Sequence, residues 1–298
     1  MRHLLEIDDL SADEVHEVLV LAGERPDLVL AGHGVALLFE KPSLRTRHST
    51  EMAVVQLGGH PVSVRADEIS IGVRETPEDI ARALSGYHAA IGARVFEHQK
   101  LERMAAVSGV PVVNLLSDEG HPLQALADLL TIQQEFATLS GLTLAWVGDY
   151  SNVARSLALA CALVGIRVRL ACPSGYAPTD ADLDRVRAIP GADIEVSSYA
   201  VEAVKGADVV STDTWYAMGQ EAEAVVRRRA FEGFTVDGAL LEQAGERAIL
   251  LHCLPAHRGE EVTEDALEGP RSRVFVQATN RMHAARAALW FLIRDMQP

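Results

Sequence analysis

Short apolar segments alternate with longer helical segments along almost the whole chain. The apolar segments are rich in Val, Ile and Leu, and between them apolar residues recur every three to four positions. This alternation is typical of βαβ units built around a mainly parallel sheet, and it predicts an α/β protein. The expected strands are residues 35–40, 90–96, 112–116, 144–148, 167–171, 207–212, 248–253 and 273–277.

The length of 298 residues suits two domains, each with a mainly parallel sheet flanked by helices. A helix is expected in PLQALADLLTIQQEF, where apolar residues follow helical spacing, and Ser140-Gly141 marks where it stops. We therefore expect domains at residues 1–135 and 136–282. A last helix at about 283–298 is expected to pack back on the first domain.

Composition and charge exclude several classes of protein. The chain is 48% hydrophobic and 23% charged, which is typical of a globular protein and not of a disordered one. With 27 basic and 42 acidic residues, its net charge of −15 makes nucleic acid an unsuitable partner. The longest apolar runs are too short to span a membrane, and the acidic N-terminal segment does not resemble a signal peptide. We expect a cytoplasmic protein without a membrane partner.

The cysteines do not indicate a disulfide framework or a metal centre. Cys161, Cys172 and Cys253 are too few and too scattered for either. We expect reduced thiols and no bound metal.

The motif FEKPSLRTRHSTE at 39–51 predicts an anion site. Ser43 is expected to cap a helix whose first turn holds Arg45, Thr46 and Arg47. Because the N-terminus of a helix already attracts anions, arginines beside it indicate a multiply charged guest, most simply a phosphate. A solvated basic face is the alternative.

A second motif, SDEGHPLQALADLL at 117–130, places His121 and Gln124 three residues apart at a helix start, with Pro122 in the first turn. Both side chains can point at one ligand. The histidine can donate to a carbonyl oxygen on which charge develops, or it can be an ordinary capped histidine.

The segment LAWVGDYSNVARS at 144–156 follows a strand–turn–helix pattern. It lacks the G-x-G-x-x-G fingerprint, which disfavours an NAD-dependent oxidoreductase. Asn152, at the start of the helix, is a candidate for binding the carboxylate or amine of a small substrate, or for capping the helix.

Three further motifs follow expected strands. In DTWYAMGQE at 213–221, Asp213 is a candidate for binding a cationic amine. In LLHCLPAHRGEE, Cys253 ends a strand beside a Leu-Pro turn, although a lone cysteine there is more often a small core residue. In NRMHAARAAL, Arg281 is expected between a strand and a helix, with a surface arginine as the alternative.

Taken in order over essentially the whole chain, these motifs resemble the aspartate/ornithine carbamoyltransferase family. HCLP is similar to the ornithine branch, whereas the aspartate branch typically has His-Pro-x-Pro-Arg at that place, and DTW with MGQE points the same way. The strings that carry the resemblance are FEKPSLRTR, HPLQALADLLT, WVGD with SN, DTW with MGQE, HCLPAHRG and NRMH.

The resemblance implies transfer of a carbamoyl group from carbamoyl phosphate to the δ-amino group of L-ornithine, giving citrulline and phosphate in arginine biosynthesis, without a metal or organic cofactor. It implies Arg45, His121, Cys253 and Arg281 as catalytic residues. The implied carbamoyl-phosphate site is Ser43, Leu44 (main chain), Arg45, Thr46, Arg94, His121, Gln124, Cys253, Leu254 (main chain) and Arg281, and the implied ornithine site is Asn152, Asp213, Ala217 and Met218.

The chain departs from the family pattern mostly on the amino-acid side. Leu44 stands where Thr is common, Tyr150-Ser151 replaces Gly-Asn, Ala217 replaces Ser, and VQATN at 276–280 replaces D-x-A-E-N. The alternatives are therefore a carbamoyltransferase for another amine and, from a different class, a protein that binds carbamoyl phosphate or an amino acid without catalysis.

The resemblance also implies a homotrimer. In it, a loop of the neighbouring subunit, near Ser70 to Glu75, would complete the carbamoyl-phosphate site.

Overall fold

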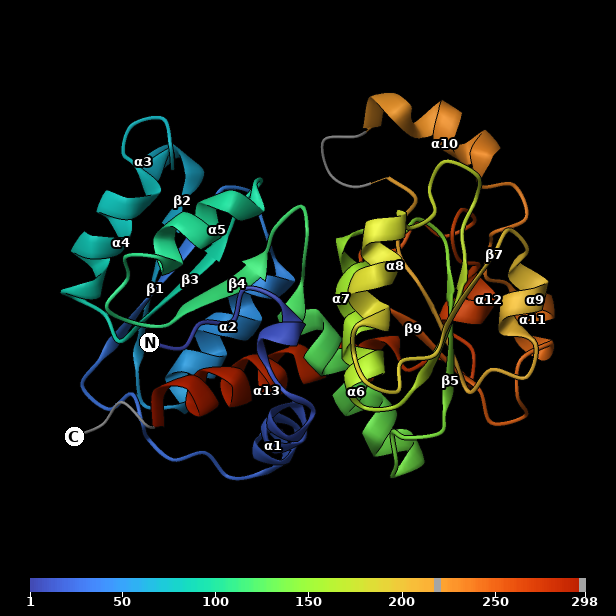
Figure 1. The fold of residues 1–298 in the computed structure, drawn as a ribbon, viewed down its shortest axis with the longest axis horizontal. Coiled ribbons are helices and arrows are strands. Elements are labelled where there is room, and N and C mark those ends of the chain that lie inside the picture. The colour runs from blue at the N-terminus through green and yellow to red at the C-terminus, as the bar shows by residue number, and fades with distance from the viewer. Residues whose placement is uncertain (217–220, 295–298) are drawn as a thin grey trace. The chain divides into compact units, whose positions relative to one another are not determined.

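The computed structural model describes residues 1–216 and 221–294, and the chain divides into two compact units (Figure 1). Unit 1 comprises Met1–Leu130 and the chain from Thr279 onward, and unit 2 comprises Thr131–Ala278. The chain leaves unit 1 within helix α6 (Pro122–Phe136) and returns to it within helix α13 (Val274–Ile293).

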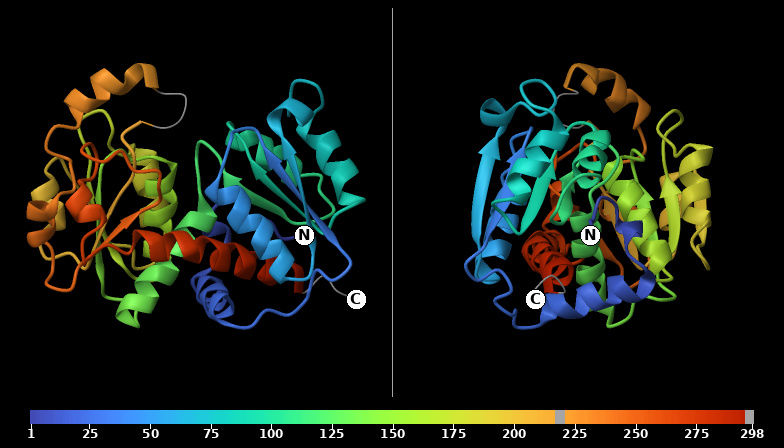
Figure 2. Two further views of the ribbon diagram at one scale, coloured as in Figure 1. Left: turned by 180° about the vertical axis from the view of Figure 1, so that it is seen from behind. Right: turned by 60° about the vertical axis from the view of Figure 1, so that its left-hand side comes forward.

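Unit 1 contains a four-stranded sheet in the order β2-β1-β3-β4, and all of its paired strands are parallel. Helix α2 covers one face, and α4 and α5 cover the other (Figures 1 and 2). Five of the six residues of β1 are buried, as expected for a central strand covered on both faces. The elements before α6 are η1 (Ile7–Asp9), α1 (Ala12–Gly23), β1 (Gly34–Phe39), α2 (Arg45–Gln56), β2 (His60–Arg65), α3 (Ala66–Ile69), α4 (Pro77–Ser85), β3 (Ala90–Arg94), α5 (His98–Ala105) and β4 (Val112–Leu116).

Unit 2 contains a five-stranded parallel sheet in the order β7-β6-β5-β8-β9. All five residues of the central strand β5 are buried, and helices α7 and α9 lie on opposite faces (Figure 1). The elements after α6 are β5 (Thr143–Val147), α7 (Asn152–Leu163), β6 (Arg167–Ala171), α8 (Asp180–Arg187), β7 (Ile194–Ser197), α9 (Ala200–Val204), β8 (Val209–Thr212), η2 (Glu221–Glu223), α10 (Ala224–Ala230), α11 (Gly238–Glu242), β9 (Ile249–His252) and α12 (Glu264–Leu267).

The predicted α/β class with two mainly parallel sheets is confirmed, but the strand expected at 273–277 is wrong. Residues 274–277 form the first turn of α13, and Arg273 directly precedes it. Val274, Gln277 and Asn280 are buried, whereas Phe275 and Val276 are exposed, so burial follows a helical period of three to four residues and not the alternation of a strand. Arg281 therefore lies inside a helix, not between a strand and a helix.

The sequence did not predict β2 and β7. Both are edge strands, and each pairs with only one neighbour in its sheet. Most of their residues are partly or fully exposed, and β2 contains Pro61. Edge strands need no continuous apolar run and tolerate proline, so the apolar pattern that reveals central strands is missing.

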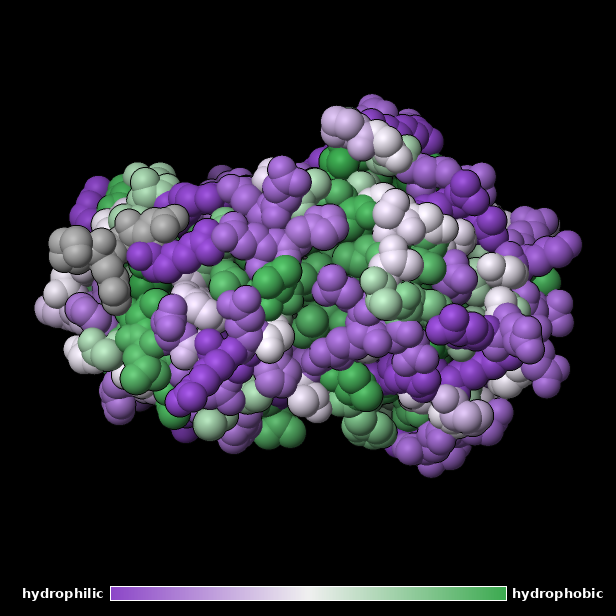
Figure 3. All heavy atoms as spheres, turned by 90° about the horizontal axis from the view of Figure 1, so that it is seen from below, coloured by the Kyte–Doolittle hydropathy of each residue, from purple (hydrophilic) through white to green (hydrophobic). Residues whose placement is uncertain are grey.

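The surface is mostly hydrophilic on the face drawn in Figure 3. Smaller hydrophobic areas interrupt the hydrophilic side chains there. Among the residues that the structure describes, no helix is both long and apolar enough to cross a membrane.

Candidate active site

Six side chains of unit 1 form a hydrogen-bonded group that we call the arginine cluster. Its centre is the buried hydroxyl of Thr46, which accepts a hydrogen bond of 2.6 Å from Arg281 and one of 3.3 Å from Arg94. Two guanidinium groups thus converge on one neutral hydroxyl, which makes the cluster strongly electropositive. Its members are Ser43, Thr46, Arg94, His121, Gln124 and Arg281.

Four elements contribute to the arginine cluster. Thr46 lies in the first turn of α2 and Arg94 ends β3, while Arg281 reaches from α13 to the Gln124 side-chain oxygen on α6 at 2.6 Å. Ser43 does not cap α2 as expected. The N-cap is Leu44, which makes no side-chain cap bond, and the Ser43 hydroxyl instead accepts from Arg94 at 3.3 Å.

His121 is the neutral member of this electropositive group. Burial, together with the positive charges of Arg281 and Arg94, lowers its pKa well below the ordinary value of 6.5. Its Nε2 lies 3.4 Å from a nitrogen of Arg281. Because a guanidinium only donates, this contact assigns the lone pair to Nε2 and the ring proton to Nδ1. A neutral imidazole beside two cations suits a ligand that is itself negatively charged.

The two arginines expected to bind phosphate have different surroundings. Arg47 forms an ion pair with Glu51 at 2.8 Å, and Ser63 donates to the same carboxylate. Arg45 is half-buried and makes no ion pair or side-chain hydrogen bond within residues 1–216 and 221–294. The side chain of Leu44 is exposed, so this residue can contribute to the site only through its main chain.

In unit 2, Asp213 and Cys253 lie side by side at the carboxyl ends of two paired strands. Thr212 of β8 is in register with His252 of β9, so the residues that follow them are neighbours. The Cys253 thiol donates to Asp213 Oδ1 at 3.0 Å, and the backbone N–H of Thr214 donates to the same oxygen at 2.7 Å. Asp213 Oδ2 makes no hydrogen bond within the described parts of the chain. Burial raises the pKa of Asp213.

The segment from His252 to Leu254, which we call the cysteine turn, forms a candidate ligand set together with Asp213. One atom each of Asp213, His252 and Cys253 lies within 4.8 Å of the others. Both ring nitrogens of His252 are engaged, Nδ1 by the Leu254 N–H at 2.9 Å and Nε2 by Glu261 at 3.2 Å. A cation bound through His252 would have to displace one of these bonds.

The structure describes only part of the expected ornithine site. Asn152 is half-buried and is the first residue of α7, and its Oδ1 accepts from the Val153 N–H at 3.0 Å. The N-cap position belongs to Ser151, which makes no side-chain cap bond, so the side chain of Asn152 satisfies a first-turn N–H from one position further along. Ala217 and Met218 lie outside the described residues.

Sequence reasoning missed two buried charged side chains in unit 2. Glu261 is completely buried beside the cysteine turn, although RGEE has the composition of an exposed loop. Arg227 is also buried and pairs with Asp149 at 2.7 Å. In each case the local sequence is polar, and only burial distinguishes Glu261 from its neighbour Glu260.

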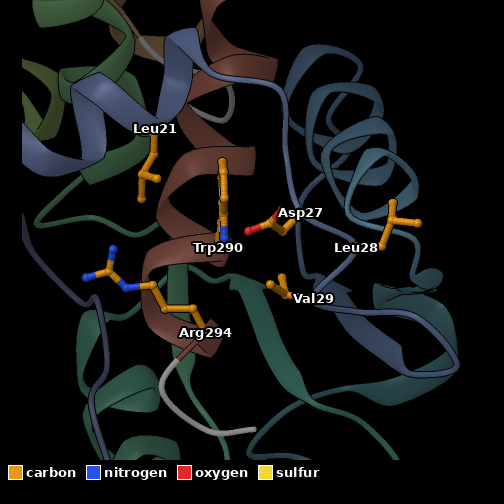
Figure 4. Close-up of a pocket in the computed structure, with 6 residues that line it drawn as sticks. All are labelled: Leu21, Asp27, Leu28, Val29, Trp290 and Arg294. Atoms are coloured by element: carbon orange, nitrogen blue, oxygen red, sulfur yellow. The ribbon is translucent and has the colours of Figure 1, made fainter.

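A separate pocket of about 490 Å³ lies in unit 1 and shares no residue with either group (Figure 4). Trp290 of α13 and Arg294, which follows this helix, line it together with Leu21 of α1 and residues 27–29. Arg294 also pairs with Glu17 at 2.6 Å.

Comparison with known proteins identifies the family. Residues 2–134 match its carbamoyl-P binding domain, and residues 140–292 match its Asp/Orn binding domain. The chain belongs to the aspartate/ornithine carbamoyltransferase family. The family predicted from the six motifs is therefore confirmed.

Members of the carbamoyltransferase family resemble this chain over nearly its whole length. The ornithine carbamoyltransferase of Acidothermus cellulolyticus is 49% identical, with 98% of this chain and 97% of that protein covered. The structure of the Pyrococcus furiosus ornithine carbamoyltransferase matches with a TM-score of 0.94 at 42% identity, covering 99% and 98% of the two chains. An N-acetyl-L-ornithine transcarbamylase is more distant, with 28% identity, a TM-score of 0.87 and coverage of 98% and 100%.

Proposed function

We propose that this chain transfers the carbamoyl group of carbamoyl phosphate to the δ-amino group of L-ornithine, forming citrulline and phosphate. The observation that carries the proposal is the arginine cluster, in which Arg94 and Arg281 converge on Thr46 beside a neutral His121. The near-full-length similarity to ornithine carbamoyltransferases supports ornithine as the acceptor.

In this proposal, unit 1 binds carbamoyl phosphate. The half-buried Arg45 and the start of α2 receive the phosphate together with Arg94, Ser43, Thr46 and the main chain of Leu44. His121, Gln124 and Arg281 hold the carbamoyl group. Negative charge develops on the carbonyl oxygen in the transition state. Hydrogen-bond donors that are already in position before the reaction stabilise this charge most effectively.

Unit 2 binds the amino acid in this proposal. Asp213 binds the α-ammonium group of ornithine. Burial disfavours the ionised form of this carboxyl group, and the positive charge of the bound ammonium favours it again. Asn152 and Met218 complete the binding of ornithine. The Leu254 N–H already donates to His252, so its main chain has the carbonyl oxygen to offer to the amide of the carbamoyl group.

The chemical step is direct attack by the neutral δ-amine on the carbonyl carbon. The new C–N bond forms, the C–O bond to phosphate breaks, and the departing phosphate accepts the amine proton. Cys253, whose thiol donates to Asp213, orients the ligand in this proposal and forms no covalent intermediate. Detection of a carbamoyl thioester on Cys253 would overturn this assignment.

The experiment is citrulline formation by the purified protein. Carbamoyl phosphate is supplied with L-ornithine, putrescine, N-acetylornithine, lysine or aspartate, and each product is quantified. Selective turnover of ornithine supports the proposal. Preference for another amine would assign specificity to Tyr150, Ser151 and Ala217, and binding without turnover would indicate a non-catalytic protein.

A homotrimer, a cytoplasmic location and a place in arginine biosynthesis belong to the same proposal. The turn from Ser70 to Glu75 is exposed at residues 72–75, and its Gly72 N–H donates to the Glu75 carbonyl at 2.8 Å. This projecting turn suits a segment that reaches a neighbouring subunit.

A further inference from the structure

A chain of buried hydrogen bonds connects Glu261 to the cysteine turn. The carboxylate of Glu261 is fully buried, and none of the roles proposed above uses it. Its Oε1 accepts from His252 Nε2 at 3.2 Å and from the backbone N–H of His257 at 2.5 Å. Burying a carboxylate is costly unless hydrogen bonds compensate for the lost water, and these two contacts provide that compensation at Oε1.

The contacts of His252 define its tautomer. The backbone N–H of Leu254 donates to Nδ1 at 2.9 Å, so Nδ1 carries a lone pair and the ring proton is on Nε2. That proton points to Glu261. A carboxylate acceptor at this place stabilises the one neutral tautomer that can hold the Leu254 N–H.

The backbone that His252 holds has an unfavourable conformation. Leu254 has φ of 59°, in the left-handed region that is unfavourable for a residue with a Cβ. On the other side of the turn, the His252 N–H donates to buried Gln277 at 2.8 Å. Cys253 lies between these two anchors with its thiol on Asp213, so release of Leu254 would also move the thiol.

We propose that Glu261 is a positioning residue for carbamoyl transfer, acting through His252 to hold the Cys253 thiol and the Leu254 carbonyl where the substrates need them. This inference rests on the proposed function. It requires no proton transfer and no contact between Glu261 and a substrate, because the effect passes through the tautomer of His252.

The kinetic test compares Glu261→Ala with Glu261→Gln in the full-length protein. We expect Glu261→Ala to lower kcat/KM for ornithine by about 10- to 100-fold, the range for lost support of a reacting group. Glutamine keeps an oxygen that accepts from His252, so Glu261→Gln should recover most of this loss. An alanine variant as active as wild type, or a glutamine variant as impaired as alanine, would overturn the proposal. A wild-type protein that makes no citrulline would instead refute the function itself.

The matched control is Glu264→Ala. Glu264 is an exposed carboxylate on the same segment that pairs with Arg258, and its loss should leave kcat/KM unchanged.

Alkylation of Cys253 separates positioning from general destabilisation. Cys161 and Cys172 are buried, whereas Cys253 is partly exposed, so iodoacetamide labelling followed by peptide mass spectrometry reads each thiol separately. In Glu261→Ala we expect Cys253 labelling to change by about threefold or more while Cys161 and Cys172 stay protected. An unchanged rate at Cys253 would contradict the proposal.

If Glu261→Ala does not fold, substitutions of His252 decide the matter. Asparagine can place its side-chain oxygen near Nδ1 and accept from the Leu254 N–H, whereas phenylalanine cannot. We expect His252→Asn to keep more activity toward ornithine than His252→Phe. Equal losses would overturn the role assigned to the His252 acceptor.

Discussion

Arg45 and Arg47 lie two positions apart on α2, and the structure distinguishes them. Arg47 is neutralised by Glu51 at 2.8 Å, whereas Arg45 has no such partner among the described residues. The sequence indicates a basic pair, and the alternative of a solvated basic face applies to Arg47, which is about two-fifths exposed and ion-paired.

We therefore expect unequal effects from two matched substitutions. Arg45→Ala should raise KM for carbamoyl phosphate by about 10-fold or more, since a hydrogen bond to a charged group contributes about 1.5–3 kcal/mol. Arg47→Ala should change KM by less than about threefold, as is usual for exposed ion pairs. Steady-state kinetics with varied carbamoyl phosphate provide the measurement. Near-normal transfer by Arg45→Ala would remove the phosphate assignment.

His121 should make the protein sensitive to acid. Its pKa is lowered in the folded state, so below about pH 6.5 the unfolded chain binds a proton that the folded chain does not, and stability falls as the pH falls. The slope is at most about 1.4 kcal/mol per pH unit. Urea unfolding between about pH 7.5 and 5 should show a steeper loss for the wild type than for His121→Gln. Parallel curves would show that His121 is not buried in its neutral form.

We expect ionised Asp213 to lower the free energy of unfolding, although it is needed to bind ornithine. Burial raises its pKa, so its ionised form destabilises the folded state at neutral pH. Asn keeps an oxygen for the Thr214 and Cys253 donors, and Asp213→Asn should therefore raise the free energy of unfolding at pH 7. The gain should begin to shrink as the pH falls through the folded pKa, and it should be gone below the unfolded pKa of about 3.9, where Asp213 is neutral in both states. KM for ornithine should rise at least about 30-fold. A variant that is less stable at pH 7 would contradict the first expectation.

Among the elements, the connection from β4 to α6 positions His121. Asn114 of β4 is fully buried, and its amide donates to the Leu5 carbonyl at 2.8 Å and to the Ser117 hydroxyl at 3.1 Å. Ser117 in turn accepts from the Gly120 N–H at 3.2 Å. One buried amide thus ties the N-terminal segment to the loop that leads into His121.

We expect Asn114→Ala to destabilise the protein by about 1–3 kcal/mol, because the partly buried Leu5 carbonyl loses its side-chain donor and the Ser117 hydroxyl loses one of its hydrogen bonds. It should also lower kcat more than it raises KM for ornithine, since His121 loses its fixed position while the acceptor site is untouched. Urea unfolding and steady-state kinetics on one preparation give both numbers. Loss of stability with unchanged kcat would limit Asn114 to a structural role.

For the whole molecule, we predict a mass of about 97 kDa for three copies of the 32.2-kDa chain. Mixing two inactive proteins tests the shared site. One carries Arg281→Ala, and the other has residues 73–75 replaced by glycines. Reassociated trimers pair an intact arginine cluster with an intact neighbouring turn, so activity should reappear. A fully active monomer, or no recovery in hybrids of confirmed composition, would contradict the proposal.

The sequence by itself was sufficient for the α/β class, the central strands and the family. Central parallel strands are apolar on both faces and therefore appear as short apolar runs in the sequence. Ligand-binding residues follow the carboxyl ends of such strands, so they form motifs directly after these runs. Segments such as 112–116 and motifs such as FEKPSLRTR carry these patterns within a few residues. No sequence pattern distinguishes the roles of Arg45 and Arg47.

The tertiary structure decided which side chains meet. Arg281 lies 235 positions from Thr46 and 157 from Gln124, and it reaches both only because residues 274–293 form a helix and not a strand. Glu261 resembles any loop carboxylate until its burial against His252 is known. Local periodicity shows which residues of a segment face the core. Hydrogen bonds between distant segments depend on where those segments lie in the fold, and a short sequence pattern does not contain this information.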